Sequence, residues 1–223
     1  LEREARRQTS SDGVNREQAI GYHRFVLDLL LLVVVLGRRG MVPRSQVIEQ
    51  VLKSMLEYAL YSMDPSGHLS QLGDTDEGWG FRLSERADYW DVRPWLAAGA
   101  VLFHHPELKF PCKYFPEEAF WLLGQSGLSE FLEMKERMPC RASSAFYDGG
   151  HYVIRDNWTP ESDFMIIKSG DFGLGGEGFC AHAHCDLLSF ILWIQGRPVV
   201  VDSGTYTYRG PWRNYFRLTS AHN

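Results

Sequence analysis

The spacing of apolar residues predicts helices up to about residue 143. Apolar positions recur every three or four residues over four segments, which are 14–37, 43–63, 87–103 and 116–123. Asp12 is the expected cap of the first segment, and Pro43 suits the first turn of the second. Pro94 predicts a kink or a restart in the third. Together the segments predict antiparallel helix hairpins.

The pattern changes near residue 143, where short β-rich runs replace the helical period. Strands are expected at 145–147, 151–155, 163–168, 187–195 and 199–202. The turn residues at 148–150 and 196–198 join these runs into two hairpins. Helices first and strands second, without alternation, predict an α+β protein. Residues 1–142 form the expected helical part, and residues 143–223 the expected β part.

Composition and charge narrow the class of protein. The chain has 223 residues, of which 44% are hydrophobic, and carries 23 basic against 28 acidic residues for a net charge of -5. This balance is typical of a globular protein and disfavours a general nucleic-acid binder. The most apolar run, 25–36, is shorter than the roughly 20 residues of a membrane span and contains Asp28, so a buried helix is expected. Neither a secretory signal nor an oligomeric state can be read from the chain, which has no initiator Met and suggests the middle of a longer or processed protein.

Two histidines one residue apart, His182 and His184, are the first candidate for chemistry. On an extended segment their side chains point to the same face, as a metal-ligand pair or as a catalytic base beside a metal; two surface histidines are the alternative. Asp202 follows three valines and is expected at the end of a buried strand, where a carboxylate needs a partner. His222 would complete a set of nitrogen and oxygen ligands that suits Zn²⁺, although the spacing is not a known zinc signature.

Aromatic and basic residues follow Asp202. Tyr206 and Tyr208 are expected to alternate on a strand and face one way, where one of them could act as an acid; packing tyrosines are the alternative. A basic strip recurs every four residues at Arg209, Arg213 and Arg217. In an acidic protein such a strip suits an anionic sugar, and a solvated edge is the alternative.

Three sequence blocks resemble the heparinase II/III-like family of polysaccharide lyases. They are HAHCDLLSF, a strand that ends in Asp202 with a Gly and a Tyr after it, and RLTSAHN. The resemblance is specific over 146–223 and weaker before that. It implies the C-terminal part of an (α/α) toroid followed by the first strands of an antiparallel β-sandwich, both truncated here, with the active site between them. It also implies cleavage of a uronic-acid-containing polysaccharide by β-elimination, in the periplasm or outside the cell.

The resemblance also implies roles for individual residues. His182 resembles the catalytic histidine, while His184, Asp202 and His222 resemble the metal set. Asn15 resembles the residue that neutralises the uronate carboxylate, and Gln18, one helical turn further on, would line the same wall. An amide or a neutral imidazole can hydrogen-bond the developing enolate, and one such donor is typically worth about 2.7–4 kcal/mol.

The chain departs from the family at the toroid tyrosine, which is not evident in the expected neighbourhood. His68 lies there instead, so His68 or a tyrosine of the β part is the expected substitute, unless lyase activity is altered. Two other classes stay open: a glycoside hydrolase that uses Asp74, Asp76 and Glu77, and a sugar-binding or assembly protein for exopolysaccharide that keeps the metal as a structural clip.

Overall fold

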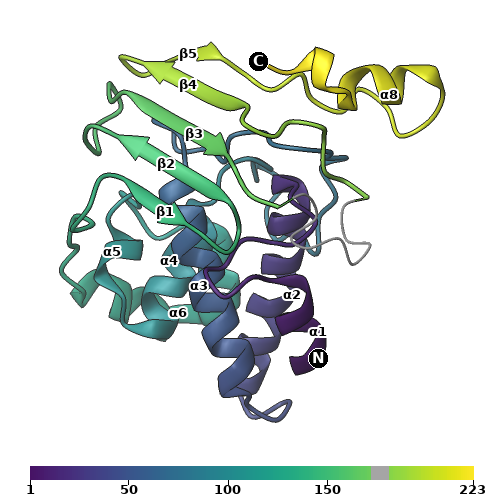
Figure 1. The fold of residues 1–223 in the computed structure, drawn as a ribbon. Helices are drawn as coiled ribbons and strands as arrows, with labels where there is room; N and C mark the ends of the chain where they lie inside the picture. The colour runs from purple at the N-terminus through teal and green to yellow at the C-terminus, as the bar shows by residue number, and fades with distance from the viewer. Residues whose placement is uncertain (172–180) are drawn as a thin grey trace.

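The computed structural model describes residues 1–171 and 181–223, and it places a group of helices against one antiparallel sheet (Figure 1). The helices before the sheet are α1 (Glu2–Gln8), α2 (Ile20–Arg38), α3 (Gln46–Ser62), α4 (Arg93–Phe103), α5 (Pro106–Lys109) and α6 (Glu117–Glu133). The strands are β1 (Ser144–Phe146), β2 (His151–Arg155), β3 (Phe164–Lys168), β4 (Phe190–Ile194) and β5 (Arg197–Val200). Helix α8 (Pro211–Arg217) and a 3₁₀ turn (Thr219–Ala221) follow. The predicted α+β class is therefore confirmed.

The helical part is organised around α3, which packs against α1, α2 and α4, while α4 packs against α6. Leu27, Leu31, Leu52 and Leu96 are fully buried at these contacts. Helix α2 is long and apolar enough to cross a membrane, but 61% of its most apolar stretch is buried inside the protein. A buried helix that belongs to a protein core passes the same test of length and composition.

Asp28, which interrupts this apolar run, is buried because it has a partner on its own helix. The Arg24 Nε atom lies 3.1 Å from Asp28 Oδ1, and both side chains are almost completely buried. The Arg24 guanidinium also stacks over the Trp95 ring at 3.6 Å. The ion pair is therefore enclosed by α2 and α4.

The expected start of the first long helix is wrong. Helix α2 begins at Ile20, and residues 9–15 form a closed turn in which the Ser10 N–H donates to the Val14 carbonyl (2.9 Å). Asp12 caps no helix; its Oδ2 accepts from the backbone N–H groups of Asp148 (2.8 Å) and Gly149 (3.0 Å). This carboxylate instead fastens the turn to the β1–β2 hairpin.

The other helix bounds differ from the predictions for local reasons. Pro43 lies outside α3, because Ser45 caps the helix by accepting from the Ile48 N–H (3.2 Å). Pro94 stands in the first turn of α4, so it marks the start of this helix, and the predicted helical residues 87–92 are not helical. Helix α6 runs to Glu133, ten residues beyond the expected end, through a kink at Gly124, where φ is 68°.

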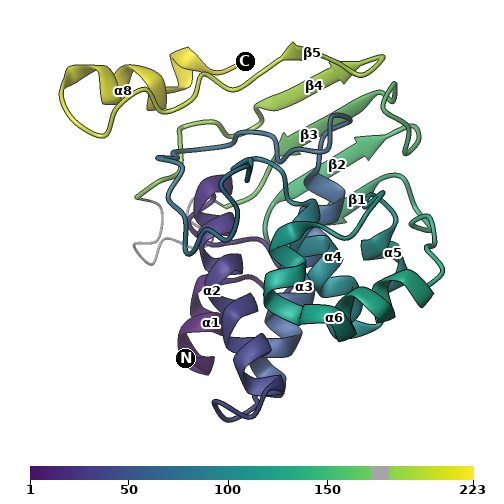
Figure 2. The same ribbon diagram turned by 180° about the vertical axis from the view of Figure 1, so that it is seen from behind.

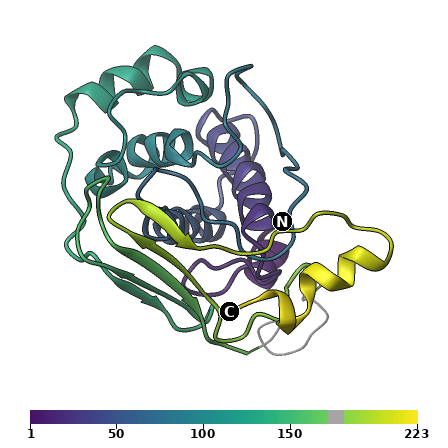
Figure 3. The same cartoon turned by 90° about the horizontal axis from the view of Figure 1, so that it is seen from above.

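The sheet is a meander in the order β1-β2-β3-β4-β5, with every neighbouring pair antiparallel. It lies along one side of the helical part (Figures 2 and 3). The buried apolar residues of its inner face are Phe146, Val153, Phe164, Ile166 and Ile191, and the polar residues His151, Arg155 and Lys168 are buried on the same face. Both predicted hairpins are confirmed.

Strand β5 is not the buried strand that its valines predict. Val199 is 57% exposed, because β5 is the outer strand of the described sheet and pairs only with β4; Val201, just after the strand, is 64% exposed. Asp202 follows it, and its carboxylate is nevertheless 4% exposed because it turns toward two histidines.

Candidate functional site

Segments from four parts of the chain meet at one end of the sheet. The Asp74 N–H donates to the His182 carbonyl (2.8 Å), which joins the loop after α3 to the loop between β3 and β4. The Cys185 N–H donates to the Arg217 carbonyl (2.8 Å), which joins the same loop to α8. His182 and His184 therefore stand in a loop and not on a strand, and the expected extended geometry is wrong, although both rings point to Asp74.

Asp74 is the centre of this cluster, and its carboxylate is fully buried. Its Oδ1 lies 3.0 Å from His184 Nε2, and its Oδ2 lies 3.5 Å from His182 Nδ1 and 2.7 Å from Arg213 Nη2. Burial alone would raise the pKa of Asp74, but hydrogen bonds from the two histidines and the charge of Arg213 hold that pKa far below its usual value. Asp74 is therefore a permanent carboxylate.

The three predicted metal ligands are brought together. His184 Nδ1 lies 3.1 Å from His222 Nε2 and 3.8 Å from Asp202 Oδ1, and His222 Nε2 lies 3.6 Å from Asp202 Oδ2. One ligand atom from each residue lies within 4.8 Å of the others. The His184 side chain is fully buried, and the Asp202 and His222 side chains are almost completely buried.

In His184 and His222, the ring nitrogen that points away from the other two predicted ligands already has a hydrogen-bond acceptor. The state of the remaining nitrogen shows whether these residues fit a metal. His184 Nε2 faces the Asp74 carboxylate, and His222 Nδ1 lies 2.9 Å from the Leu218 carbonyl. Both acceptors require an N–H, so each inner nitrogen presents a lone pair. Two lone pairs 3.1 Å apart beside a carboxylate repel one another unless a cation or a proton lies between them. These residues fit a divalent metal with nitrogen and oxygen ligands.

Aromatic rings enclose His182 on its other side. The Tyr22 ring stacks on the imidazole at 3.8 Å between centroids, and the Tyr208 ring meets it edge-on at 5.8 Å. The two phenol oxygens are 3.3 Å apart. Burial is the largest cause that raises the pKa of both tyrosines, so both hydroxyls keep their protons near neutral pH. His182, a candidate base, thus lies in contact with two potential proton donors, Tyr22 and Tyr208.

The three arginines of the basic strip have different surroundings. Arg213 is bound to Asp74 and lies over the Tyr208 ring at 4.8 Å. The Arg217 Nη2 atom donates to the Ala183 carbonyl (2.9 Å), inside the HAH segment. Arg209 precedes α8 and is exposed. Arg213 and Arg217 therefore both donate to the loop that carries His182 and His184, through the Ala181 and Ala183 carbonyls. Arg209 is the exposed cation of the strip.

Two other predicted residues, Tyr206 and His68, lie apart from these histidines. Tyr206 does not alternate with Tyr208 on a strand, because its φ of 56° turns the backbone; its ring is 72% exposed and stacks on Phe216 at 5.3 Å. His68 makes an ion pair with Asp88 (3.1 Å). Within residues 1–171 and 181–223, neither Tyr206 nor His68 has a hydrogen bond, ion pair or ring contact with His182 or His184.

Asn15 and Gln18 lie in the turn before α2, and both are buried. The Asn15 Oδ1 atom accepts from the Glu17 N–H (3.0 Å), while its Nδ2 is buried without a hydrogen-bond partner among the described residues. The Gln18 Nε2 atom donates to the Asp171 carbonyl (3.2 Å). The described contacts do not join Asn15 to His182, and the unpartnered amide remains available to a ligand.

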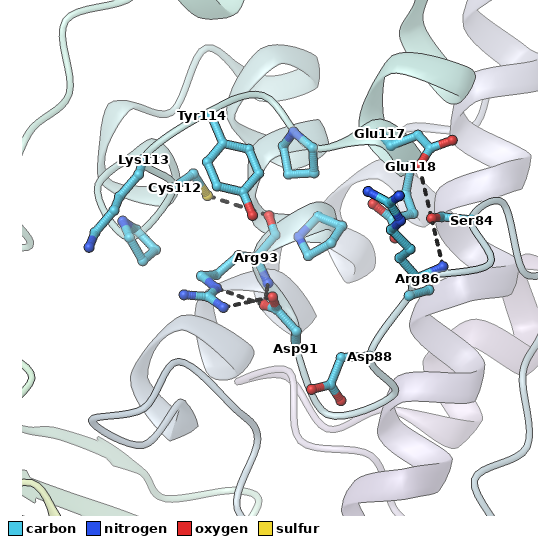
Figure 4. A pocket seen from close by; sticks show the side chains of 14 residues that line it. Ser84, Arg86, Asp88, Asp91, Arg93, Cys112, Lys113, Tyr114, Glu117 and Glu118 are labelled. Carbon is cyan, nitrogen blue, oxygen red and sulfur yellow. Dashed lines mark hydrogen bonds and ion pairs between the residues drawn. The ribbon is translucent and has the colours of Figure 1, made fainter.

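A separate pocket of about 270 Å³ lies between residues 84–94 and 111–118 (Figure 4). Arg93 is paired with Asp91 at 2.8 Å, and the Ser84 hydroxyl donates to Glu117 at 2.9 Å. These groups satisfy one another, and the candidate metal group of the described residues does not line this pocket. The histidine cluster is therefore the better functional site.

Sequence reasoning missed the roles of Tyr22 and Asp74. Tyr22 begins the Tyr-His pair of α2, and Asp74 stands in the acidic run of residues 74–77. Neither pattern indicates a contact with a histidine more than a hundred residues later. The role of Asp74 is recognised only in the folded chain, where its buried carboxylate lies between the two histidines.

Comparison with known proteins finds similarity to heparin-sulfate lyases. Residues 138–223 match the model of the family described as "Heparinase II/III-like, C-terminal". A heparin-sulfate lyase of Pedobacter heparinus is 25% identical over 240 residues, covering 100% of this chain and 30% of the relative. A heparin-sulfate lyase of Bacteroides stercoris is 32% identical over 91 residues, covering 39% of this chain and 13% of the relative.

Solved structures show the same fold. The crystal structure of the heparan sulfate lyase HepC from Pedobacter heparinus has a TM-score of 0.70 at 24% identity and covers 99% of this chain and 31% of that one. A heparinase III structure has a TM-score of 0.72 at 22% identity, again over 99% of this chain. The chain thus spans about 30% of the length of the Pedobacter relative. The HAH loop, the β4–β5 hairpin and the RLTSAHN segment all lie within residues 138–223, the part of the chain that is similar to the C-terminal domain of the heparinase II/III-like family.

Proposed function

We propose that the protein is a polysaccharide lyase that cleaves a uronic-acid-containing polysaccharide by β-elimination. The observation that carries the proposal is the packing of His182 between Tyr22 and Tyr208 beside the buried Asp74 carboxylate. Two relatives named heparin-sulfate lyase support an acidic polysaccharide of the glycosaminoglycan class as the substrate.

The reaction removes the C5 proton beside the uronate carboxylate and expels the oxygen on C4. Asp74 faces His182 Nδ1 at 3.5 Å, which favours the tautomer with its proton on Nδ1 and leaves Nε2 to accept the C5 proton. Tyr22 and Tyr208 keep their protons, and either hydroxyl can then protonate the leaving oxygen. Sequence reasoning offered His68 or a tyrosine of the β part for this role; in this proposal Tyr208 is that tyrosine, and Tyr22 of the helical part stands beside it.

Substrate binding in this proposal uses the remaining predicted residues. The unpartnered Asn15 amide hydrogen-bonds the uronate carboxylate, and Gln18 lines the same wall. Arg209 binds an anionic group of a neighbouring sugar because it is the exposed cation of its strip. Arg213 and Arg217 act mainly by holding Asp74 and the Ala183 carbonyl.

The proposed cofactor is Zn²⁺, held by His184, Asp202 and His222. The inward lone pairs of the two histidines and the buried carboxylate support this choice. When bound, the metal supplies positive charge that stabilises negative charge developing nearby. His184 also contacts Asp74, so the metal set and the His182 set share one carboxylate.

The wider architecture is part of the proposal. Residues 1–142 would belong to an (α/α) toroid and residues 143–223 to a β-sandwich, with the substrate between them. The family resemblance also suggests a periplasmic or secreted protein. The position of His182 between a residue of α2 and one that follows β5 supports a site at such a junction.

The test is to incubate the protein with heparan sulfate, alginate and other uronans and follow the ultraviolet absorbance of the unsaturated product. We expect absorbance with at least one uronan and its loss in His182→Ala. Chain cleavage without absorbance would favour a hydrolase, and binding without cleavage would favour a sugar-binding protein. The lowered pKa of Asp74 makes this residue unsuited to be the general acid of a hydrolase, because that role needs a raised pKa.

A further inference from the structure

Lys168 and Asp186 form a buried ion pair outside the set of residues that the proposed reaction uses. The Lys168 Nζ atom lies 2.5 Å from Asp186 Oδ1, and the two side chains are 5% and 2% exposed. Burying two charges is costly, and an apolar pair of similar volume often stabilises a protein as well or better. The pair therefore points to a role in fixing a specific conformation.

The conformation concerned is that of the histidine loop, residues 181–189. Asp186 stands two residues after His184, and its carbonyl accepts from the Ser189 N–H (3.0 Å). The Lys168 backbone holds the same loop, since its carbonyl accepts from the Leu188 N–H (2.7 Å) and its N–H donates to the Ser189 carbonyl (3.0 Å). One residue at the end of β3 thus holds the loop through side chain and backbone together.

On the other side, Lys168 belongs to a series of buried polar side chains that reaches the helices. Lys168 is directly opposite His151 in the β2–β3 register, and His151 Nδ1 lies 2.7 Å from the Tyr58 hydroxyl on α3. The Tyr58 ring meets His23 edge-on at 4.9 Å. His23 is on α2, so the series reaches the helix that also carries Tyr22.

We propose that Lys168 is a positioning residue, whose ion pair with Asp186 fixes the loop so that His182 and His184 both face Asp74. The inference rests on the proposed function for its effect on elimination. Its effects on the loop and on metal affinity can be measured separately.

The test compares Lys168→Met with Arg155→Met. Arg155 is a matched control because it is a buried cation on the neighbouring strand β2 that donates to the Met63 carbonyl in the helical part. Both variants should lower the melting temperature. Only Lys168→Met should weaken Zn²⁺ binding, by about 10–100-fold in competition with a chelating dye, and speed hydrogen exchange in peptides that cover 181–190.

The outcomes are distinct. Unchanged exchange and unchanged Zn²⁺ affinity in Lys168→Met would overturn the inference, as would an equal change in Arg155→Met. If the wild-type protein binds no Zn²⁺ or has no lyase activity, the proposed function fails while hydrogen exchange still decides the role of Lys168. Should Lys168→Met not fold, Asp186→Asn keeps one acceptor for the ammonium, and it should change exchange and affinity in the same direction by a smaller factor.

Discussion

Replacing Asp74 by Asn is the most informative change to the candidate site. The fully buried carboxylate lies next to three nitrogen atoms, which are Nδ1 of His182, Nε2 of His184 and a guanidinium nitrogen of Arg213. Asparagine has nearly the same shape, but it offers one acceptor oxygen and turns an NH₂ group toward the other donors. The variant therefore separates charge from volume.

The size of the effect follows from these contacts. At least one of the donors at 2.7 and 3.0 Å loses its acceptor, and a buried donor left unpaired costs about 1–3 kcal/mol of folding free energy. Loss of the carboxylate behind His184 should weaken metal affinity about 10–100-fold, as for other outer partners of ligating histidines. Loss of the orienting group behind His182 should lower the elimination rate by about 10²–10⁴ if His182 is the base.

The assay follows three quantities in the same preparation: the urea midpoint, the Zn²⁺ affinity and the initial rate of ultraviolet absorbance on heparan sulfate. Asp76→Asn is the matched control, because Asp76 is two residues away and its Oδ1 accepts only from the Gly78 N–H (3.2 Å) among its described hydrogen bonds. We expect little change in that control. Wild-type metal affinity and rate in a folded Asp74→Asn protein would refute the orienting role of this carboxylate.

Three further predictions follow from the same geometry. His184→Ala should abolish stoichiometric Zn²⁺ binding measured by metal analysis, whereas His182→Ala should retain the metal and lose elimination; loss of the metal in both would contradict the division of roles. At least one of Tyr22→Phe and Tyr208→Phe should slow elimination about 10²–10⁴-fold at unchanged metal content, which would identify the proton donor, while the exposed Tyr206→Phe should not. Burial lowers the pKa of both His23 and His151 to about 3 from 6.5, so their neutral forms give full stability above pH 6.5. That stability is lost as the pH falls toward 3, by up to about 1.4 kcal/mol per pH unit and ring. Urea midpoints at pH 7.5 and 5 check this, and a slope unchanged by His23→Leu would count against it.

The order of helices and strands could be predicted from the sequence because it depends on local periodicity. The stripe of α3 and the alternation in β2 each give a pattern that a short segment carries by itself. The ends of the elements were predicted less well. Asp12 has the side chain of a helix cap, but its carboxylate accepts hydrogen bonds from backbone N–H groups of the β1–β2 turn instead. A distant competitor for the same oxygen is invisible to a local rule.

The candidate site divides in the same way. The HAH spacing, the RLTSAHN segment and the family they resemble were determined by the sequence, because these signals lie within contiguous stretches. Only the tertiary structure decided that Tyr22 stacks on His182, that Tyr206 turns away, and that Asp74 joins His182 to His184. The contacts of Tyr22 and Asp74 with the two histidines connect residues more than a hundred positions apart. They depend on how the helices, the histidine loop and α8 pack together, which no periodicity in the chain records.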